Sequence, residues 1–492
     1  MITNSHKANG CSVTDGYDLD QSLINEILLS LGREYFSEFY QQRDTSGLDY
    51  PLSPLACCQN IAALSQFDLS ELNVPYKPAV EHVLDVNAVR RDFPILSEKI
   101  DGKDLVWFDN AATTQKPRHV IERIKYFYEH ENSNVHRAAH TLAARTTDAY
   151  ESARSRVASF LHAASADEIV FVRGTTEGIN LVAQAYGLSA LSQGDEVVLS
   201  LLEHHANIVP WQMVCARTGA RIKVIPVDEG GQIDLSEYRK LLSAKTKIVA
   251  FTHVSNSLGI LTPAAEMVHM AHQYGAKVLI DGAQAVAHRK VDVRELDCDF
   301  YVFSGHKVFG PTGVGVLYAK AAILNSMQPY QGGGSMIEDV TFDNTTYKKP
   351  PHRFEAGTGS IADAIGLAAA LDYITGIGLK RISEYEHRLY MHGEEALRSI
   401  NGLTLIGDAE GRTSILPFVS VRMPPEEIGA ILNKEGIAVR TGHHCAQPIL
   451  RKFGHESTVR ISLALYNTIN EIDFLVSVLR RKLMSFSCIF PF

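Results

Sequence analysis

From about Asp85 onward, short apolar runs alternate along the chain with longer segments in which apolar residues recur at helical spacing. The runs are DEIVFV, GDEVVLS, RIKVIPV, TKIVAFT, AKVLID and CDFYVFS, and they lie between residues 167 and 304. Alternation of buried strands with helices is typical of a mostly parallel sheet that carries helices on both faces. Such sheets bind ligands at the carboxyl ends of their strands.

The pattern changes beyond about residue 375. A helical segment is followed by two strand-like runs, ILPFVSVRM and GIAVRTG, and then by a final helical segment. We therefore expect a large α/β domain over residues 87–374 and a small α+β domain over residues 375–492. We also expect the first ~20 residues of the large domain to join the small one.

The first 86 residues differ in composition from the rest. They hold 12 Asp and Glu against 4 Lys and Arg, a net charge of −8, whereas all 492 residues together have a net charge of −9. Apolar residues between positions 20 and 40 recur at helical spacing, but Pro51 and Pro54 break the segment that follows. This imbalance indicates an appended, partly disordered extension.

Composition excludes several classes of protein. No apolar run is long enough to cross a membrane, and the N-terminus lacks the basic and apolar regions of a secretory signal. No basic stretch suggests binding to nucleic acid. The seven cysteines show no metal-site spacing, so we expect a cytoplasmic protein with neither a structural zinc nor a metal in its active site.

Two ionisable residues follow predicted strands. Asp281 ends the run AKVLID, and Lys307 follows CDFYVFS in the stretch YVFSGHKVFGPTGVG. Taken singly, Asp281 reads as a helix cap and Lys307 as a surface lysine. Taken together at strand ends of one sheet, they are what pyridoxal phosphate (PLP) needs, namely a Schiff-base lysine and a carboxylate for the pyridine nitrogen.

Hydroxyl and imidazole groups near other strand ends could serve the same cofactor. Thr175 and Thr176 open a predicted helix in RGTTEGIN, and Ser304 and His306 lie beside Lys307, so all four could bind a phosphate. A simple hydroxyl helix cap is the alternative for the threonines. His204, in LLEHHANIVPW, could stack on the ring and move protons, or be an ordinary surface histidine.

A series of motifs runs through about four-fifths of the chain: DNAATTQKP, NVHRAAHTLA, RGTTEGIN, EHHANIVPW, HVSNSLG, DGAQAV, SGHKVFGPTGVG, YQGGGSMI, RFEAGT, AVRTGHHCAQP and VRISLALYNT. In this order they resemble the Suf-type, or group II, cysteine desulfurases, which are fold-type I PLP enzymes of the aminotransferase class V family. The resemblance implies a large domain with a mostly parallel, seven-stranded sheet and a homodimeric enzyme.

The resemblance also implies a role for each matching residue. Lys307 would form the Schiff base and move protons, Asp281 would pair with the pyridine nitrogen, and His204 would stack on the ring. The other implied contacts are Gln284 and Asn256 near the ring oxygen, Asn256 also near the substrate carboxylate, Thr175, Thr176, Ser304 and His306 at the phosphate, Thr358 at the phosphate of the other subunit, Arg460 at the substrate carboxylate, and His136 and Arg440 at the substrate entrance.

Cys445, in TGHHCAQP, is the candidate nucleophile. It follows the strand GIAV on a polar loop beside His443, His444 and Arg440, and positive neighbours favour a thiolate. The alternative is a small buried hydrophobe. The resemblance implies conversion of L-cysteine to L-alanine, with sulfur passing to Cys445 as a persulfide. An acceptor protein or a small thiol would then take it, for example in iron–sulfur assembly.

Two other functions stay open at this point. A selenocysteine lyase shares the fold and nearly all the motifs, and selenium can be eliminated without the nucleophilic cysteine. A chain that serves mainly as assembly cargo or scaffold is the second alternative, against which the complete set of site residues argues.

The chain departs from the family pattern in two places. GTGSIAD (Gly357 to Asp363) stands where the family has GTPN, which puts the local turn and the dimer-facing surface in question. The acidic, proline-broken extension of residues 1–86 resembles those of desulfurases packaged inside encapsulin shells. It implies that this segment binds a shell protein and that the enzyme resides in an encapsulin compartment of the cytoplasm.

Overall fold

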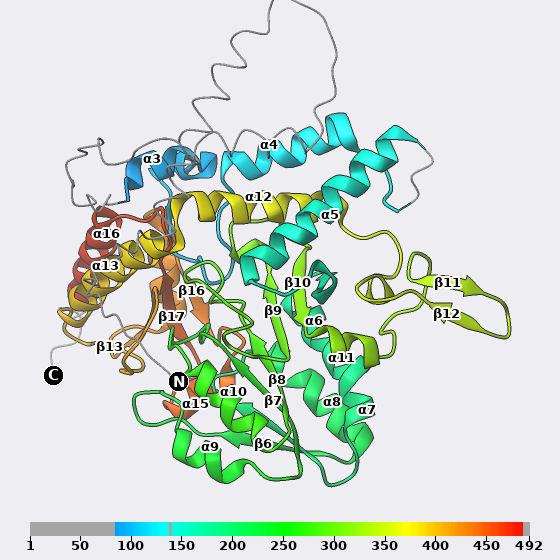
Figure 1. Cartoon of the computed structure of the whole chain (residues 1–492). Helices are drawn as coiled ribbons and strands as arrows, with labels where there is room; N and C mark the ends of the chain where they lie inside the picture. Colours follow the sequence, from blue (N-terminus) through cyan, green and yellow to red (C-terminus); the bar gives the residue numbers. More distant parts are fainter. Residues whose placement is uncertain (1–83, 137–139, 486–492) are drawn as a thin grey trace, which may run out of the picture. The chain divides into compact units, whose positions relative to one another are not determined.

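A seven-stranded sheet forms the centre of the computed structural model, which describes residues 84–136 and 140–485 (Figure 1). Its strands are β4 Ile169–Val172, β5 Glu196–Ser200, β6 Arg221–Ile225, β7 Thr246–Thr252, β8 Lys277–Asp281, β9 Phe300–Ser304 and β10 Gly315–Ala319. They lie in the order β4, β10, β9, β8, β7, β5, β6. Only β10 runs antiparallel to its neighbours; the other pairs are parallel.

The six apolar runs of the sequence form six of these strands, which confirms the expected mostly parallel sheet. β10 is not among those runs. It lies between β4 and β9 and follows the glycine-rich loop after Lys307, so a short reversal of the chain, rather than a helical crossover, returns it to the sheet.

Helices and short helical turns surround the sheet. The helices are α3 Val86–Arg91, α4 Arg118–Tyr126, α5 Thr141–Leu161, α6 Thr175–Leu181, α7 Leu188–Ala190, α8 Val209–Thr218, α9 Leu235–Leu241, α10 Ala264–His272, α11 Ala321–Ser326, α12 Ile361–Ile377, α13 Leu379–Arg398, α14 Pro425–Lys434, α15 Gln447–Lys452 and α16 Ile469–Ser485. The turns are η3 Pro94–Ser97, η4 Phe127–Glu131, η5 Ala166–Glu168, η6 Val182–Gly187, η7 His205–Asn207, η8 Gly305–Lys307 and η9 His352–Phe354.

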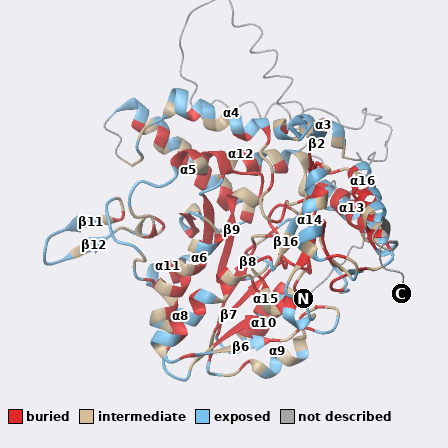
Figure 2. Ribbon diagram, turned by 180° about the vertical axis from the view of Figure 1, so that it is seen from behind, coloured by how far each residue is buried: buried red, intermediate tan, exposed pale blue. Residues whose placement is uncertain are grey.

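The sheet separates two apolar layers, because successive side chains of a strand point to opposite faces. In β4, Ile169 and Phe171 belong to one layer and Val170 and Val172 to the other. Helices α5, α10 and α12 contribute to the first layer, and α6, α8 and α11 contribute to the second. With both faces covered, the strands other than the edge strand β6 are almost wholly buried (Figure 2), which explains their continuous apolar runs.

A second, antiparallel sheet lies towards the C-terminus. Its strands are β13 Leu403–Leu405, β14 Ile415–Ser420, β17 Thr458–Ser462 and β16 Arg440–Gly442, in that spatial order. Helices α13, α14 and α16 pack with it around a third apolar cluster. Of the short strands, β3 (Val106–Trp107) pairs in parallel with β15 (Ile437–Ala438), and β1 (Lys99–Ile100) pairs with β2 (Lys103–Asp104).

The β3–β15 pair joins a segment near the start of the described chain to its C-terminal part. The exact bounds of the two domains stay a prediction. The helical pattern expected between residues 20 and 40, and the extension that contains it, lie outside the described residues.

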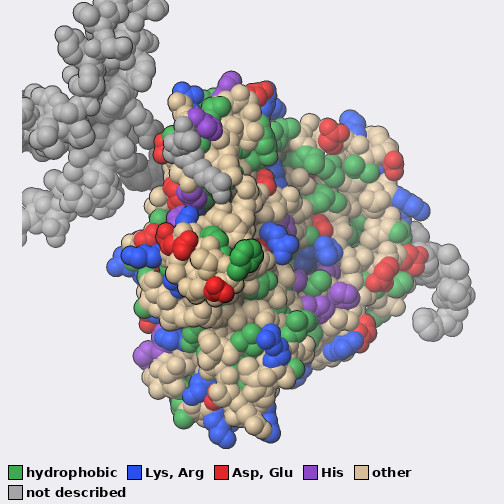
Figure 3. Space-filling model, turned by 90° about the vertical axis from the view of Figure 1, so that its right-hand side faces the viewer, with side chains coloured by type: hydrophobic (Ala, Val, Ile, Leu, Met, Phe, Trp, Pro, Cys, Tyr) green, Lys and Arg blue, Asp and Glu red, His purple; other side chains and the backbone are tan. Residues whose placement is uncertain are grey.

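A hairpin of β11 (Ile337–Val340) and β12 (Thr345–Tyr347) projects from the body of the molecule (Figure 1). Val340 and Phe342, near its tip, are exposed. Seen from the side on which this hairpin lies, acidic, basic and apolar side chains are interspersed over the surface (Figure 3).

Within residues 84–136 and 140–485, no single helix is both long enough and apolar enough to span a membrane. Helices α12 and α13 satisfy the criterion only as a pair, and they are bent by 76° relative to each other. Helix α12 is packed in the core, with ten buried residues.

Candidate active site

One pocket collects side chains from the carboxyl ends of four central strands. Asp281 ends β8, Ser304 ends β9 and Thr252 ends β7, while Thr175 follows β4 at the start of α6. All four line the same pocket. Parallel strands bring their carboxyl ends to one edge of the sheet, so these residues meet although they are far apart in sequence.

Lys307 lies at the end of η8, directly after β9. Burial in the pocket, together with the positive charges of Arg460 and Arg440, lowers the pKa of its amine to about 8, although Asp281 opposes this shift. The chain turns back sharply after it, since Gly313 has a φ of +76° and Gly310 donates to the carbonyl of Gly305. The result is a reactive amine on a rigid turn.

Asp281 is buried at the end of β8, and its carboxylate accepts a hydrogen bond of 2.9 Å from the amide of Ala283. Burial raises its pKa, while that amide and Lys307 work in the opposite direction. Gly282 lets the chain leave the strand here, because a Cβ at this position would lie 2.2 Å from the ring of Tyr301. A cationic group in the pocket would complete the pairing of this acid.

His204 follows β5 and lines the same pocket. Its Nδ1 accepts a hydrogen bond of 3.0 Å from the amide of Ala206, which leaves the ring proton on Nε2. Burial and then the charge of Lys307 lower its pKa to about 3, so the ring is neutral at physiological pH.

Four donors gather at one end of the pocket. The amide of Thr175 donates to Ser304 Oγ at 2.9 Å, and the two hydroxyls lie 2.8 Å apart. Thr176 and His306 line the pocket beside them. Burial lowers the pKa of His306 to about 4, with smaller effects of Lys307 and Lys116.

Arg460, on β17, approaches the pocket from the C-terminal sheet and is buried. Its guanidinium donates to the carbonyl of Asn256 at 2.9 Å and to Asp109 Oδ1 at 3.0 Å, whereas its Nε has no partner among the described residues. Arg440 lies 3.9 Å from the other oxygen of Asp109. Asp109 thus holds two arginines at the pocket, and part of one guanidinium is free for an anion.

Cys445 lies on the four-residue loop between β16 and α15, where His444 and Cys445 have φ values of +51° and +55°. The Cys445 amide donates to His443 Nδ1 at 3.0 Å, and the Cys445 carbonyl accepts from the amide of His205 at 2.8 Å. Asn256 donates to the His444 carbonyl at 2.7 Å. Consecutive left-handed residues are strained, and these contacts hold the half-buried thiol in position.

The pocket therefore holds twelve of the fourteen residues proposed from the sequence: Thr175, Thr176, His204, Asn256, Asp281, Gln284, Ser304, His306, Lys307, Arg440, Cys445 and Arg460. Gln284 uses its amide to donate to the carbonyl of Ala111 at 2.6 Å.

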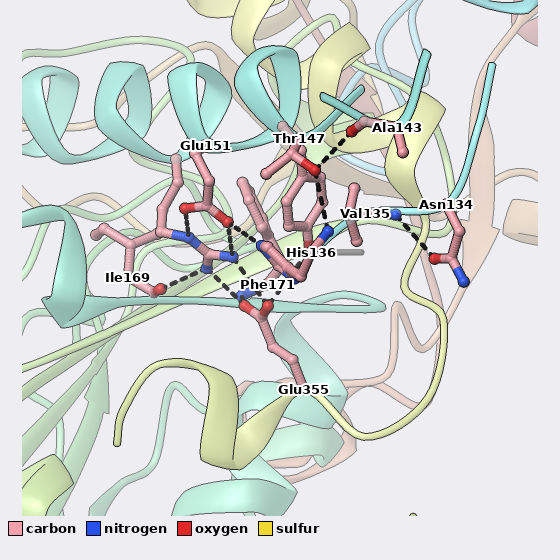
Figure 4. A network of polar contacts seen from close by, with 11 residues as sticks. Asn134, Val135, His136, Ala143, Thr147, Glu151, Ile169, Phe171 and Glu355 are labelled. Carbon is pink, nitrogen blue, oxygen red and sulfur yellow. Dashed lines mark hydrogen bonds and ion pairs between the residues drawn. The ribbon is translucent and has the colours of Figure 1, made fainter. Parts of the chain in front are cut away.

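Thr358 and His136 lie outside this pocket. Thr358 lines a second pocket with Arg173, Glu177 and Gly313. His136 lies before α5 and Glu151 lies on α5, and their side chains point toward one another (Figure 4). Neither residue reaches Lys307 within a single chain.

Sequence reasoning missed three residues that shape the pocket. Asp109 is part of the motif DNAATTQKP, but nothing in that motif signals its contact with Arg460. Glu203 is fully buried and accepts from Asn207 at 2.6 Å, from the Thr252 amide at 2.9 Å and from Ser200. His444 is buried, with its Nε2 2.8 Å from Thr458 Oγ1. For Glu203 and His444, the available signal was their place in the sequence next to a candidate site residue, His204 or Cys445.

The residues present fit PLP. The pocket offers an amine on a turn, a buried carboxylate, a neutral imidazole and a group of hydroxyls at one end. In addition, the unpaired Nε–H of Arg460 can donate a hydrogen bond to a substrate carboxylate. Both the lysine and the acid are groups that PLP needs.

The aminotransferase class-V family matches residues 106–475, three-quarters of the chain. The chain belongs to the aminotransferase class-V family. A protein of Escherichia coli K12 named cysteine desulfurase is 50% identical over 400 residues, which cover 81% of this chain and 98% of that protein.

Other members of this family are more similar but longer. The cysteine desulfurase of Synechococcus elongatus is 62% identical over 81% of this chain and 63% of its own length. The probable cysteine desulfurase of Mycolicibacterium paratuberculosis is 57% identical over 82% of this chain and 59% of its own length. The chain therefore spans less than two thirds of these two relatives.

Solved structures of the family have the same architecture. The cysteine desulfurase CsdA of Escherichia coli, in an S-sulfonic acid form, has a TM-score of 0.76 at 39% identity, over 82% of this chain and 99% of CsdA. The apo cysteine desulfurase of Thermococcus onnurineus has a TM-score of 0.78 at 37% identity, over 81% and 98%. The fold is therefore the fold type I of PLP enzymes, as expected.

Proposed function

We propose that this chain is a PLP-dependent cysteine desulfurase of the Suf type, which converts L-cysteine to L-alanine. The observation that carries the proposal is the pocket in which Lys307, Asp281, Arg460 and the thiol of Cys445 meet. A lysine and an acid alone would suit many PLP enzymes. The cysteine on a strained loop at the same pocket is what favours sulfur transfer.

The cofactor would lie with its phosphate at Thr175, Thr176, Ser304 and His306, and with its ring between His204 and the floor of the pocket. Asp281 would pair with the ring nitrogen. When bound, PLP supplies an electron sink for the charge that develops at the substrate Cα. Gln284 and Asn256 would lie near the ring oxygen.

The substrate carboxylate would bind Arg460, whose Nε is unpaired, with Asn256 beside it. Arg440 is half-exposed at the mouth of the pocket and would attract the same carboxylate. Asp109 would keep both guanidinium groups in position.

Lys307 would accept the proton from the substrate Cα and return it later. Its lowered pKa suits this task, because the neutral amine is available near pH 8. Nδ1 of His204 accepts from the Ala206 amide, so its Nε2–H would donate to groups on its side of the pocket and orient them.

Cys445, in its thiolate form, would attack the substrate sulfur. A bond forms between Cys445 Sγ and the substrate sulfur while the substrate Cβ–S bond breaks. The electron pair of the broken bond stays with the carbon fragment, and protonation of that carbon completes alanine. Cys445 is left as a persulfide, and a second thiol, on a small molecule or an acceptor protein, takes the outer sulfur.

The experiment that tests this function is alanine formation from L-cysteine with dithiothreitol as the final acceptor. The wild type is expected to form alanine, Cys445→Ala is expected to lose this activity, and Cys215→Ala, at a buried cysteine on α8, is expected to keep it. A selenocysteine lyase would give the opposite result: little alanine from cysteine, and release of selenium from selenocysteine by both the wild type and Cys445→Ala.

We propose a homodimer, in which Thr358 reaches the phosphate of the other subunit. Thr358 lies outside the Lys307 pocket, and the hairpin before it exposes Val340 and Phe342, which a second copy would cover. Sedimentation of the purified protein should give twice the mass of one chain. A monomer that retains full activity would contradict the proposal.

We further propose that residues 1–86 address the enzyme to an encapsulin shell in the cytoplasm. The charge break at residue 86 and the departure at GTGSIAD support this idea. Co-expression with a candidate shell protein, with and without residues 1–86, should load only the full-length chain. Equal loading of both would refute the proposal.

A further inference from the structure

Two histidines and a glutamate meet outside the Lys307 pocket. His136 lies before α5, Glu151 lies on α5, and His352 opens η9. His136 Nε2 is 2.8 Å from Glu151 Oε1, and one ligand atom from each of the three residues lies within 4.8 Å of the other two. The rings of His136 and His352 are 4.7 Å apart between centroids.

We propose that His136, Glu151 and His352 bind one divalent transition-metal ion of the Zn²⁺ class. Two imidazoles and one carboxylate are a ligand set that this class of ion takes, with a fourth position left for water. Ligand atoms of a tetrahedral zinc lie ~3.3 Å apart, given metal–ligand bonds of about 2.0–2.1 Å. The ligand atoms lie within 4.8 Å of one another, so metal binding would draw them closer together.

The nearby arginine does not cancel the charge of the site. Arg154 donates to Glu151 at 2.9 Å and to both oxygens of Glu355 at 2.6 and 2.9 Å. One arginine thus faces two carboxylates, and a net negative charge remains for a cation. Arg154 also orients the Glu151 carboxylate, as partners behind a metal ligand commonly do.

The backbone positions at the site are held. His136 has a φ of +58°, and its amide donates to Thr147 Oγ1 at 3.0 Å. A small pocket beside the three residues is lined by Tyr150, Ser335, Gly357 and Gly359, which provides access for the ion and room for its water. A bound metal would tie the loop before α5 to η9 and stiffen the glycine-rich loop that carries Thr358.

The sequence could not show this site, because 15 residues separate His136 from Glu151 and 201 separate Glu151 from His352. The expectation of no metal rested on local spacing alone. The inference is independent of the proposed function, since the three residues lie outside the Lys307 pocket.

The test uses the full-length protein with its cofactor, freed of metal by a chelator. Zn²⁺ is titrated in competition with a coloured chelator, and Co²⁺ is added separately as a spectroscopic probe. The variants are His352→Gln and Glu151→Gln, and the control is His119→Gln, at an exposed histidine on α4. Thermal unfolding is measured with and without Zn²⁺.

The wild type and His119→Gln should bind Zn²⁺ alike, with four-coordinate Co²⁺ absorption that lacks a thiolate charge-transfer band. His352→Gln should weaken Zn²⁺ binding by at least about tenfold and abolish the rise in unfolding temperature. The proposal is overturned if His352→Gln binds Zn²⁺ as the wild type does, or if the Co²⁺ spectrum shows thiolate ligands. Alanine formation is measured on metal-free protein. Its result does not depend on the Zn²⁺ titration, so the proposed function is tested separately.

Discussion

The Lys307 pocket and the cluster of His136, Glu151 and His352 contrast in how the chain builds them. Most residues of the pocket follow strands of the central sheet, and Arg440, Cys445 and Arg460 come from the C-terminal sheet and the loop after it, so their meeting is a consequence of the fold. The cluster joins a loop, the middle of a long helix and a short turn that no sheet aligns. Sites at strand ends can therefore be read from a sequence, whereas sites between loops and helices need coordinates.

The two sites also differ in electrostatics. The pocket combines a buried acid with a lysine and two arginines, and burial, aided by the charges of the two arginines, lowers the pKa of Lys307. The cluster has two carboxylates around one arginine and keeps Glu151 ionised. The pocket therefore suits an anionic cofactor and substrate, and the cluster suits a cation.

The largest effect is expected at Lys307. Lys307→Met should lower the rate of alanine formation by more than about 10³-fold, because both the attachment of the cofactor and the proton transfer are lost. Lys116→Met is the matched control, since burial lowers the pKa of Lys116 to about 8 as well but it lies outside the pocket. If both variants lose activity to the same extent, the assignment of Lys307 as the reactive lysine of the pocket is contradicted.

A smaller effect is expected at Asp109, which positions the two arginines. Asp109→Asn should raise the KM for cysteine by about 10- to 100-fold, since a hydrogen bond to a charged group is lost, and should change kcat little. Steady-state kinetics of this variant and of Asp104→Asn, at an exposed aspartate, give the comparison. A fall in kcat with unchanged KM would mean that Asp109 acts in the chemistry rather than in substrate binding.

The lowered pKa of Lys307 also predicts a pH effect on stability in the cofactor-free protein. The unfolded amine titrates near 10.4, so between about pH 8 and that value the unfolded chain binds more protons and stability rises with pH. Lys307→Met lacks this group and should be more stable than the wild type at pH 7, with a difference that shrinks by pH 10. Urea unfolding at both pH values measures it, and a constant difference would contradict the shift.

The smallest effect concerns the pH dependence of metal binding at the cluster. Because His136 and His352 bind a metal only through a neutral imidazole, Zn²⁺ affinity should fall as the pH is lowered through the range in which imidazoles gain a proton, at about 6.5. Titrations at several pH values between about 5.5 and 7.5 test this. A Zn²⁺ affinity that stays constant over that range would contradict ligation by histidine.

The fold was accessible from the sequence because buried parallel strands are continuous apolar runs. All six runs became strands, whereas β10 was not separated from the loop before it, since its apolar residues follow a glycine-rich turn. For the pocket, Asp281 and Lys307 could be chosen because each follows such a run.

The rest of the site depended on three-dimensional contacts. Asp109 precedes its partner Arg460 by more than 350 residues, and nothing in DNAATTQKP indicates an ion pair. Glu203 is adjacent to His204, but only the structure shows the donors around its carboxylate. Thr358 and His136 lie outside the Lys307 pocket, and their positions relative to a substrate rest on the proposed homodimer.

The most direct test of the central claim is the sulfur on Cys445. The purified protein is treated with L-cysteine without a reductant, digested, and the peptide that contains Cys445 is weighed by mass spectrometry. The account predicts a peptide heavier by one sulfur atom, and alanine equal in amount to the sulfur bound. Alanine formed in that amount while the Cys445 peptide stays unmodified would contradict it.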